Sequence, residues 1–130
     1  IHPETGPYFD YFIVQAYSNL AGNSDANLDR RLAGTLANFK GILPPEKVAN
    51  MYIVTENFES YAPTGGGDYV DRYGNKMRAL AGMARWTPTI DGKQVRKGGV
   101  GTYHMEYDYP GDIEYKYLRE AIRIMNPAVK

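Results

Sequence analysis

The hydrophobic pattern of the chain alternates between short runs typical of strands and periodic stretches typical of helices. The first run, Tyr8 to Tyr17, is rich in β-branched and aromatic residues and predicts a strand with apolar side chains on both faces. Beyond it, leucines recur at every fourth position, which predicts a helix capped by Asn23 or Ser24 and ended by Gly41. The expected buried positions of this helix are Leu28, Leu32, Leu36 and Phe39.

Two further strand-then-helix units follow the first. Met51 to Thr55 predicts the second strand, and Asp68, after a glycine-rich loop, predicts the cap of the second helix. Val100 to Met105 predicts the third strand, and Asp112 predicts the cap of a last helix that ends before Pro127. The expected buried positions are Tyr69, Tyr73, Met77 and Leu80 in the second helix, and Tyr115, Leu118, Ile122 and Met125 in the last.

This order of elements predicts the α/β class, with parallel strands joined by right-handed crossovers. A small hairpin is expected between the second helix and the third strand, where Asp91-Gly92 separates two short apolar pairs. Three strands that are apolar on both faces need neighbours that this chain does not supply. Either more of the sheet lies upstream, or the chain is a small three-layer sandwich.

Charge and composition exclude several classes of function. The chain has 15 basic and 15 acidic residues, which argues against a nucleic-acid or anionic-membrane partner. No apolar run approaches the roughly 20 residues that span a bilayer. The absence of cysteine and the presence of only two histidines, His2 and His104, predict neither a metal site nor a cofactor.

Tyrosine is the unusual component, with twelve in 130 residues. Tyrosine rings end in a hydrogen-bonding group, and sugar-binding clefts use such rings because a pyranose has an apolar face and a polar rim. Most of the twelve are nevertheless expected to fill core and strand positions.

Polar or aromatic side chains end each predicted strand, at the edge where parallel sheets bind ligands. Because side chains alternate along a strand, Gln15 and Tyr17 share a face, as do Tyr103 and Met105. An amide beside a phenol suits a neutral polar ligand. The other candidates at these ends are Glu56, Asn57 and Glu106.

At these residues the chain resembles family 18 of the glycoside hydrolases, in particular the endo-β-N-acetylglucosaminidases. Gln15-Ala16-Tyr17 is similar to the Gln-any-Tyr element of that family, and Gly99 to Asp108 resembles its eighth barrel strand, with Tyr103 where many chitinases have Trp. The resemblance implies that residues 1–130 form one segment: the last three β/α units, strands six to eight with the closing helix, of a (β/α)8 TIM barrel. An upstream segment of the same protein would complete the barrel.

The resemblance also implies a mechanism in which the acetamide of a bound N-acetylglucosamine acts as the nucleophile. Tyr17 would then hydrogen-bond the acetamide carbonyl, Gln15 would help to hold the same sugar, and Tyr103 would lie under its ring. Met105 would share that face. Glu56, Asn57 and Glu106 would be contacts at the rim of the site.

One departure from the family pattern limits what this chain can do. The acid-bearing motif Asp-Gly-any-Asp-any-Asp-any-Glu is absent, and the sole Asp-Gly, at Asp91-Gly92, belongs to the predicted turn. The chain alone therefore cannot catalyse by the family route. Three functions remain open: the binding half of a hydrolase of N-acetylglucosamine-containing glycans, a non-catalytic glycan-binding relative, or a small self-contained α/β interaction domain. The resemblance implies a secreted, periplasmic or cell-surface protein.

Overall fold

A three-stranded parallel sheet organises the computed structural model, which describes residues 1–16, 23–57, 67–103, 105–108 and 114–128. Its strands are β1 (Phe12–Gln15), β3 (Tyr52–Asn57) and β8 (Gly99–Tyr103), in the order β1-β3-β8. Phe12 pairs with Tyr52 and Ile53 with Gly99, so all three strands run in the same direction. The parallel arrangement expected from the alternating pattern is confirmed.

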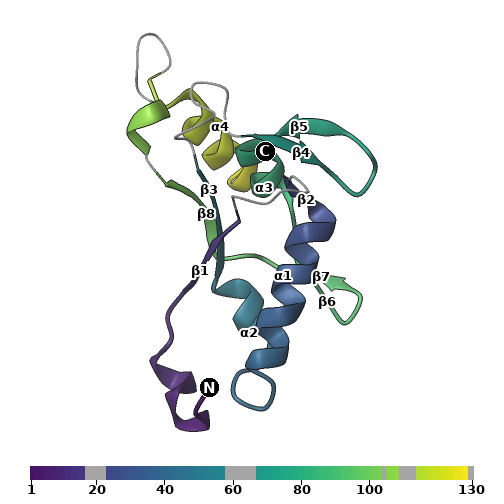
Figure 1. Cartoon of the computed structure of the whole chain (residues 1–130), viewed down its shortest axis with the longest axis vertical. Helices are drawn as coiled ribbons and strands as arrows, with labels where there is room; N and C mark the ends of the chain where they lie inside the picture. Colours follow the sequence, from purple (N-terminus) through teal and green to yellow (C-terminus); the bar gives the residue numbers. More distant parts are fainter. Residues whose placement is uncertain (17–22, 58–66, 104, 109–113, 129–130) are drawn as a thin grey trace.

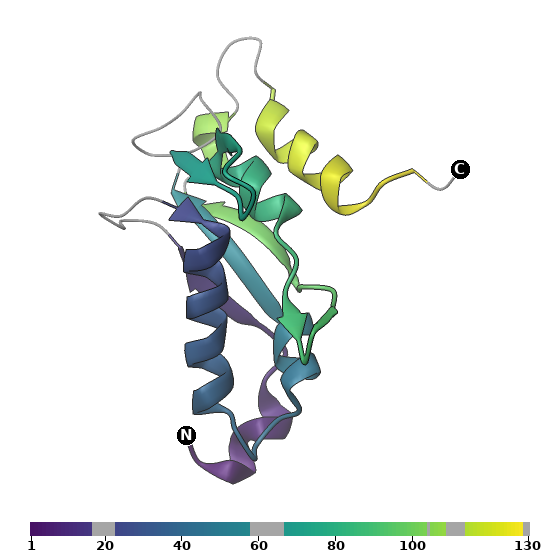
Figure 2. The same cartoon turned by 90° about the vertical axis from the view of Figure 1, so that its right-hand side faces the viewer.

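The helices gather on one face of this sheet. Figure 1 shows β1, β3 and β8 on the left of the molecule and the helices α1 (Asp25–Asn38), α2 (Pro45–Asn50) and α3 (Ala79–Arg85) to their right. Figure 2, seen from that right-hand side, shows α1 and α3 in front of the strands. The core lies between these layers and includes Leu28, Leu32, Tyr52, Val54, Met83 and Trp86.

Helix α1 forms where the leucine spacing predicts it. The Ser24 hydroxyl accepts a hydrogen bond of 3.0 Å from the Asn27 backbone N–H, which caps the helix as expected. Its predicted face packs into the core, with Leu28, Leu32 and Phe39 buried and Leu36 packed against them. Gly41 has a φ of 76° in the turn that follows, a conformation that glycine adopts without strain.

The expected helix from Asp68 through Leu80 is wrong. Asp68–Val70 forms strand β4 and Lys76–Arg78 forms strand β5, and the two pair as an antiparallel hairpin. A parallel pairing of β4 with β2 (Asn23–Ser24) makes a second small sheet. Tyr69 is buried in β4, whereas Tyr73 lies in the turn, so these residues do not share a helical face.

A second hairpin, β6 (Thr89–Ile90) with β7 (Lys93–Gln94), confirms the turn expected at Asp91-Gly92. Both turn residues have positive φ, 51° for Asp91 and 76° for Gly92, as a two-residue hairpin loop requires. The chain then reaches β8 through Lys97, whose Nζ donates hydrogen bonds of 2.8 Å to the Ala84 carbonyl and 2.7 Å to the Trp86 carbonyl. Lys97 thereby caps the carboxyl end of α3.

The last helix, α4 (Lys116–Met125), has a different cap and a different face from those expected. The predicted cap, Asp112, lies outside the described residues. The carboxylate of Asp108, in the 3-10 helix η2 (Met105–Asp108), accepts a 2.9 Å hydrogen bond from the Leu118 backbone N–H. Ile122 is exposed and Tyr115 precedes the helix in a left-handed conformation, so both expectations for buried residues are wrong. The side chains that pack on α3 and β8 are Tyr117, Leu118, Ala121, Ile124 and Met125.

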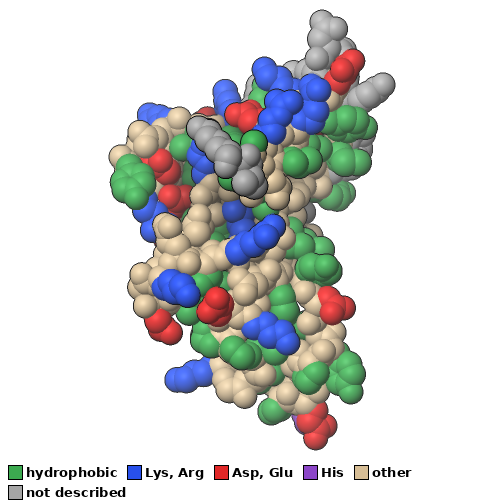
Figure 3. All heavy atoms as spheres, turned by 180° about the vertical axis from the view of Figure 1, so that it is seen from behind, with side chains coloured by type: hydrophobic (Ala, Val, Ile, Leu, Met, Phe, Trp, Pro, Cys, Tyr) green, Lys and Arg blue, Asp and Glu red, His purple; other side chains and the backbone are tan. Residues whose placement is uncertain are grey.

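The start of the chain also differs from expectation. The strand predicted from Tyr8 begins only at Phe12, because Pro3–Tyr8 forms the 3-10 helix η1. No helix in the described part of the chain has the length and apolarity needed to cross a membrane. Figure 3, seen from behind, shows Lys and Arg side chains gathered in its upper part, where α4 lies, and hydrophobic side chains along the edge where the strands lie.

Candidate functional site

The sheet has one face covered by helices and one that is not covered by the described residues. Phe12, Val14 and Ala16 pack into the core, whereas the alternate residue Ile13 is 69% exposed and Gln15 is also exposed. The same alternation places Tyr11, exposed just before β1, on the uncovered side. A stripe of exposed Tyr and Ile on a parallel sheet is unusual, because such sheets are ordinarily covered on both faces.

Strand register brings the candidate ligand-binding residues onto this uncovered face. Gln15 pairs with Thr55, which pairs in turn with Gly101. Tyr103 lies two residues beyond Gly101 on the same face of β8 and is 50% exposed. Gln15 and Tyr103 therefore share the face near the carboxyl ends of their strands, as the alternation of side chains predicts.

Glycines leave the uncovered face without large side chains between Gln15 and Tyr103. Gly99 and Gly101 place no side chain beside β3, and a Cβ on Gly101 would lie 3.3 Å from Cγ2 of Thr55. The Thr55 hydroxyl is turned toward β1, where it donates a 2.9 Å hydrogen bond to the Val14 carbonyl. The result is a shallow floor of backbone and small side chains, bordered by an amide on β1 and a phenol ring on β8. Such a floor can accept a flat, polar-edged ligand.

The comparisons with known proteins agree with this geometry. The family model for glycoside hydrolase family 18, BT1044-like, matches residues 1–124. The chain belongs to glycoside hydrolase family 18. Its fold is similar, with a TM-score of 0.73 and 32% sequence identity, to a solved structure titled as a selenomethionine, Glu-to-Gln form of BT1044. None of the curated proteins matches this chain.

The chain covers only part of that solved relative. The similarity includes 96% of this chain but 36% of the other, so this family 18 sequence spans about a third of the relative's length. The resemblance inferred from Gln15-Ala16-Tyr17 and the Tyr103 strand is therefore confirmed at the level of the family. The resemblance is therefore not accidental.

The structure places the remaining predicted site residues of this family 18 chain in different surroundings. The strand predicted through Met105 ends at Tyr103, and Met105 is 55% exposed in η2, so the expectation that the two share a strand face is wrong. Asn57 ends β3 opposite Tyr103, but its side chain and that of Glu106 are not described. Tyr17 lies outside the described residues. The roles assigned to all of these residues stay predictions.

Glu56 lies on the helix-covered side of the sheet, away from Gln15 and Tyr103. It is 1% exposed, and its Oε2 accepts a 2.8 Å hydrogen bond from the Asn23 side-chain amide. This contact joins the end of β3 to β2. The predicted contact between Glu56 and the ligand stays a prediction. The burial of Glu56 on the helix-covered side argues against it.

A buried polar cluster that the sequence did not reveal connects the β4–β5 hairpin to α1. The Tyr69 hydroxyl donates a 2.6 Å hydrogen bond to Oδ1 of Asp25, and the Arg72 backbone N–H donates a 2.9 Å bond to Oδ2 of the same carboxylate. Arg72 also lies 3.7 Å from Asp29, which accepts a 2.8 Å bond from the Trp86 indole N–H. Burial first, and the Asp25 carboxylate second, raise the pKa of Tyr69 above its usual value. Tyr69 therefore acts here as a hydrogen-bond donor and not as an acid.

The sequence does not reveal this cluster, because its pattern predicts a helix from Asp68 to Leu80. A signal was present: Asp71, Gly74 and Asn75 are turn-forming residues between two short alternating segments. Among the described residues, no group of three or more His, Cys, Asp or Glu side chains is placed to hold a metal ion. Neither the cluster nor the uncovered face therefore offers a metal centre within the described parts of the chain.

Proposed function

We propose that the chain supplies the ligand-binding half of a family 18 site that acts on N-acetylglucosamine-containing glycans. The observation that carries this proposal is the common placement of Gln15 and Tyr103 on the uncovered face, at the carboxyl ends of β1 and β8, the parallel strands on either side of β3. An amide and a phenol ring beside a glycine floor match the polar rim and apolar face of a pyranose. Family membership supports a glycan as the ligand class.

The uncovered face would be the inside of a (β/α)8 barrel completed by an upstream segment. Three features support this proposal: the parallel strands, the helices restricted to one face, and the exposed Ile13 and Tyr11 on the other. Covering such apolar side chains releases ordered water and stabilises the closed structure by about 25 cal/mol for each Å² buried. The span of about a third of the related structure leaves enough chain in such a protein for the remaining strands.

The residues on this face would bind and orient the sugar but not protonate it. Tyr17 would donate a hydrogen bond to the acetamide carbonyl, and Gln15 would hold the same sugar over Tyr103, so that the acetamide oxygen attacks the anomeric carbon. The proton for the leaving oxygen must come from an acid outside this chain, because the Asp-Gly-any-Asp-any-Asp-any-Glu motif is absent from it. Endo-β-N-acetylglucosaminidase or chitinase-like activity is the finer form of this proposal, and secretion is its expected setting.

The test uses the longest natural protein that contains this chain, with chitooligosaccharides and an N-glycan as substrates. We expect Gln15→Ala and Tyr17→Phe to lower kcat/KM by at least about tenfold, because each removes a group that orients the reacting acetamide. Asn50→Ala and Tyr8→Phe are matched controls, since both side chains are exposed and lie outside the site. Unchanged hydrolysis in both site variants would remove this assignment.

A second candidate function is a glycan-binding relative without activity, which keeps Gln15 and Tyr103 on the uncovered face but lacks the acid in the segment that completes the site. It predicts that the same protein binds the oligosaccharides, that Gln15→Ala weakens this binding, and that no hydrolysis occurs. Product analysis by mass spectrometry alongside calorimetry separates the two functions.

A further inference from the structure

A polar pocket lies on the helix side of the molecule, across the sheet from the site proposed above. It has a volume of about 220 Å³ and is bounded by the β4–β5 turn, by Thr87 after α3 and by Gln94 on β7. Tyr73, Arg72, Asp25 and Arg85 are among the residues that line it. Neither hydrolysis nor the uncovered face uses any of these residues.

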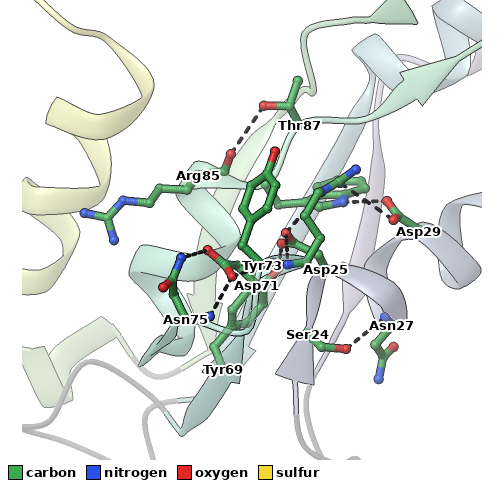
Figure 4. Close-up of polar contacts among 12 residues, drawn as sticks. Ser24, Asp25, Asn27, Asp29, Tyr69, Asp71, Tyr73, Asn75, Arg85 and Thr87 are labelled. Carbon is green, nitrogen blue, oxygen red and sulfur yellow. Dashed lines mark hydrogen bonds and ion pairs between the residues drawn. The ribbon is translucent and has the colours of Figure 1, made fainter. Parts of the chain in front are cut away.

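Tyr73 is an exposed aromatic ring held on a rigid turn. It is 82% exposed at the tip of the hairpin. The Asp71 carboxylate accepts hydrogen bonds from the backbone N–H groups of Tyr73, at 2.9 Å, and Asn75, at 2.8 Å, and a third from the Asn75 amide. Figure 4 shows the Tyr73 ring directed toward the segment that carries Arg85 and Thr87. These bonds hold the backbone of the turn, so the point from which the ring projects is set before a ligand binds.

Arg72 is fixed beside this ring by two carboxylates. Its Nε lies 3.4 Å from Oδ2 of Asp25, and its Nη2 lies 3.7 Å from Oδ2 of Asp29. Within the described parts of the chain, these contacts leave Nη1 without a hydrogen bond, and the side chain is 39% exposed. The guanidinium therefore presents donors to the pocket in a preset orientation while two acids balance its charge.

We propose that this pocket is a second saccharide-binding site, in which Tyr73 packs on the apolar face of a sugar ring and Arg72 donates hydrogen bonds to its oxygen atoms. Thr87 lines the same pocket, and its hydroxyl, which donates a 3.3 Å hydrogen bond to the Arg85 carbonyl, can accept one from a further sugar hydroxyl. The ligand is a neutral sugar and not an anion, because three carboxylates at the pocket outnumber its two guanidinium groups and would repel a negative charge; the charged residues are Asp25, Asp29, Asp71, Arg72 and Arg85. The inference shares with the proposed function only the class of ligand, since the two sites lie on opposite faces of the sheet.

A second binding site on the surface increases the affinity of the protein for long glycans. When one sugar unit is held at Tyr73, other units of the same polymer stay at high local concentration near the protein. Capture of long chains then exceeds capture of short ones without any change in the chemistry of the first site. Substrate length is therefore the variable that reveals the second site.

The experiment measures binding of the longest natural protein that contains this chain to a soluble N-acetylglucosamine hexamer and to an N-glycan, by titration calorimetry and ligand-observed NMR. Tyr73→Ala removes the ring, and Tyr73→Phe keeps it. Tyr8→Ala is the control, because Tyr8 is also a highly exposed tyrosine, at 84%, but belongs to η1 and not to the pocket. We expect Tyr73→Ala to weaken binding at the second site about three- to tenfold, with Tyr73→Phe and Tyr8→Ala close to the wild type. The kcat/KM for a short substrate should not change.

Failure of this inference is distinguishable from failure of the proposed function. Two results would overturn the second site and leave the first intact. In one, Tyr73→Ala and the wild type bind both glycans with equal affinity. In the other, the wild type binds glycan at a single site, and Gln15→Ala abolishes that binding. Binding that depends on Tyr73 but not on Gln15, with no hydrolysis, would support the second site and overturn the catalytic proposal. A wild type that binds neither glycan overturns both.

Discussion

The Tyr69 hydroxyl donates a 2.6 Å hydrogen bond to Oδ1 of Asp25, a residue 44 positions earlier in the chain. Both side chains are buried, at 1% and 7% exposure. This bond fixes the β4–β5 hairpin to the first turn of α1, and it turns the Asp25 carboxylate toward the Arg72 backbone. Figure 4 shows the contacts that spread from this pair toward Asp29. This contact adds a side-chain link to the β2–β4 strand pairing that also holds the hairpin in place.

Removing the Tyr69 hydroxyl should loosen the hairpin. Tyr69→Phe leaves Oδ1 of Asp25 buried without its donor, which we expect to lower the free energy of unfolding by about 1–3 kcal/mol. Urea unfolding followed by tryptophan fluorescence measures this, because Trp86 is hydrogen-bonded to Asp29 in the same cluster. Tyr73→Phe is the control, since that hydroxyl is on an exposed ring. Equal stability of the two variants would show that the bond contributes nothing.

Close packing of Gly82 against Tyr69 gives a second, independent test. A Cβ at position 82 would lie within van der Waals overlap of the Tyr69 ring, so Gly82→Ala must displace that ring from Asp25. We expect a loss of about 1–3 kcal/mol in the free energy of unfolding. Gly34→Ala is the matched control in α1, because no atom lies within 4 Å of the added Cβ, and it should gain about 0.5–1 kcal/mol. The Tm of each variant is measured by thermal unfolding. A shift of both Tm values in the same direction would contradict the packing argument.

Lys97 should make stability rise with pH in the alkaline range. Burial, with Arg96 as a lesser cause, lowers the pKa of this lysine to about 8, below its value in the unfolded chain. Between pH 8 and about 10.4, the unfolded state therefore holds a proton that the folded state has released, and the free energy of unfolding increases. Both hydrogen bonds to Ala84 and Trp86 survive, because a neutral amine keeps two N–H donors.

The measurement compares urea midpoints of the wild type and Lys97→Met at pH 7 and pH 9.5. The wild type should gain stability relative to the variant at the higher pH. This comparison cancels the titration of tyrosines such as Tyr52 and Tyr69, whose pKa values are raised by burial and which act in both proteins. A pH-independent difference between the two proteins would show that Lys97 stays protonated throughout.

We expect the Asp108 carboxylate to stabilise the first turn of α4. Its carboxylate accepts hydrogen bonds from the backbone N–H groups of Leu118, at 2.9 Å, and Tyr117, at 3.4 Å. Asp108→Ala should cost about 1 kcal/mol and speed amide hydrogen exchange in the first turn of the helix. Asp112→Ala is the informative comparison, because sequence spacing alone predicts that residue as the cap. Faster exchange in Asp112→Ala than in Asp108→Ala would reverse the assignment.

The short-range part of the candidate site could be predicted from the sequence. The placement of Gln15 beyond Ile13 and of Tyr103 beyond Gly101 follows from the two-residue period of a strand, once the strands are recognised. The burial of Glu56 follows from the same period, but only after it is known which face the helices cover. The second pocket could not be predicted, since its walls come from segments joined by the contact between Asp25 and Tyr69.

The sequence by itself determined the elements whose signals are local: the three core strands, the Ser24-capped helix α1 and the Asp91-Gly92 hairpin. Their hydrophobic period, cap and turn residues act within a few positions. Only the tertiary structure decided that Tyr69 belongs to a strand, because its partners, Asn23 across β2 and Asp25 in α1, are more than forty residues away. It likewise decided that Asp108 caps α4. Where local propensity is weak, the buried hydrogen bond that a segment can make with a distant one selects its conformation.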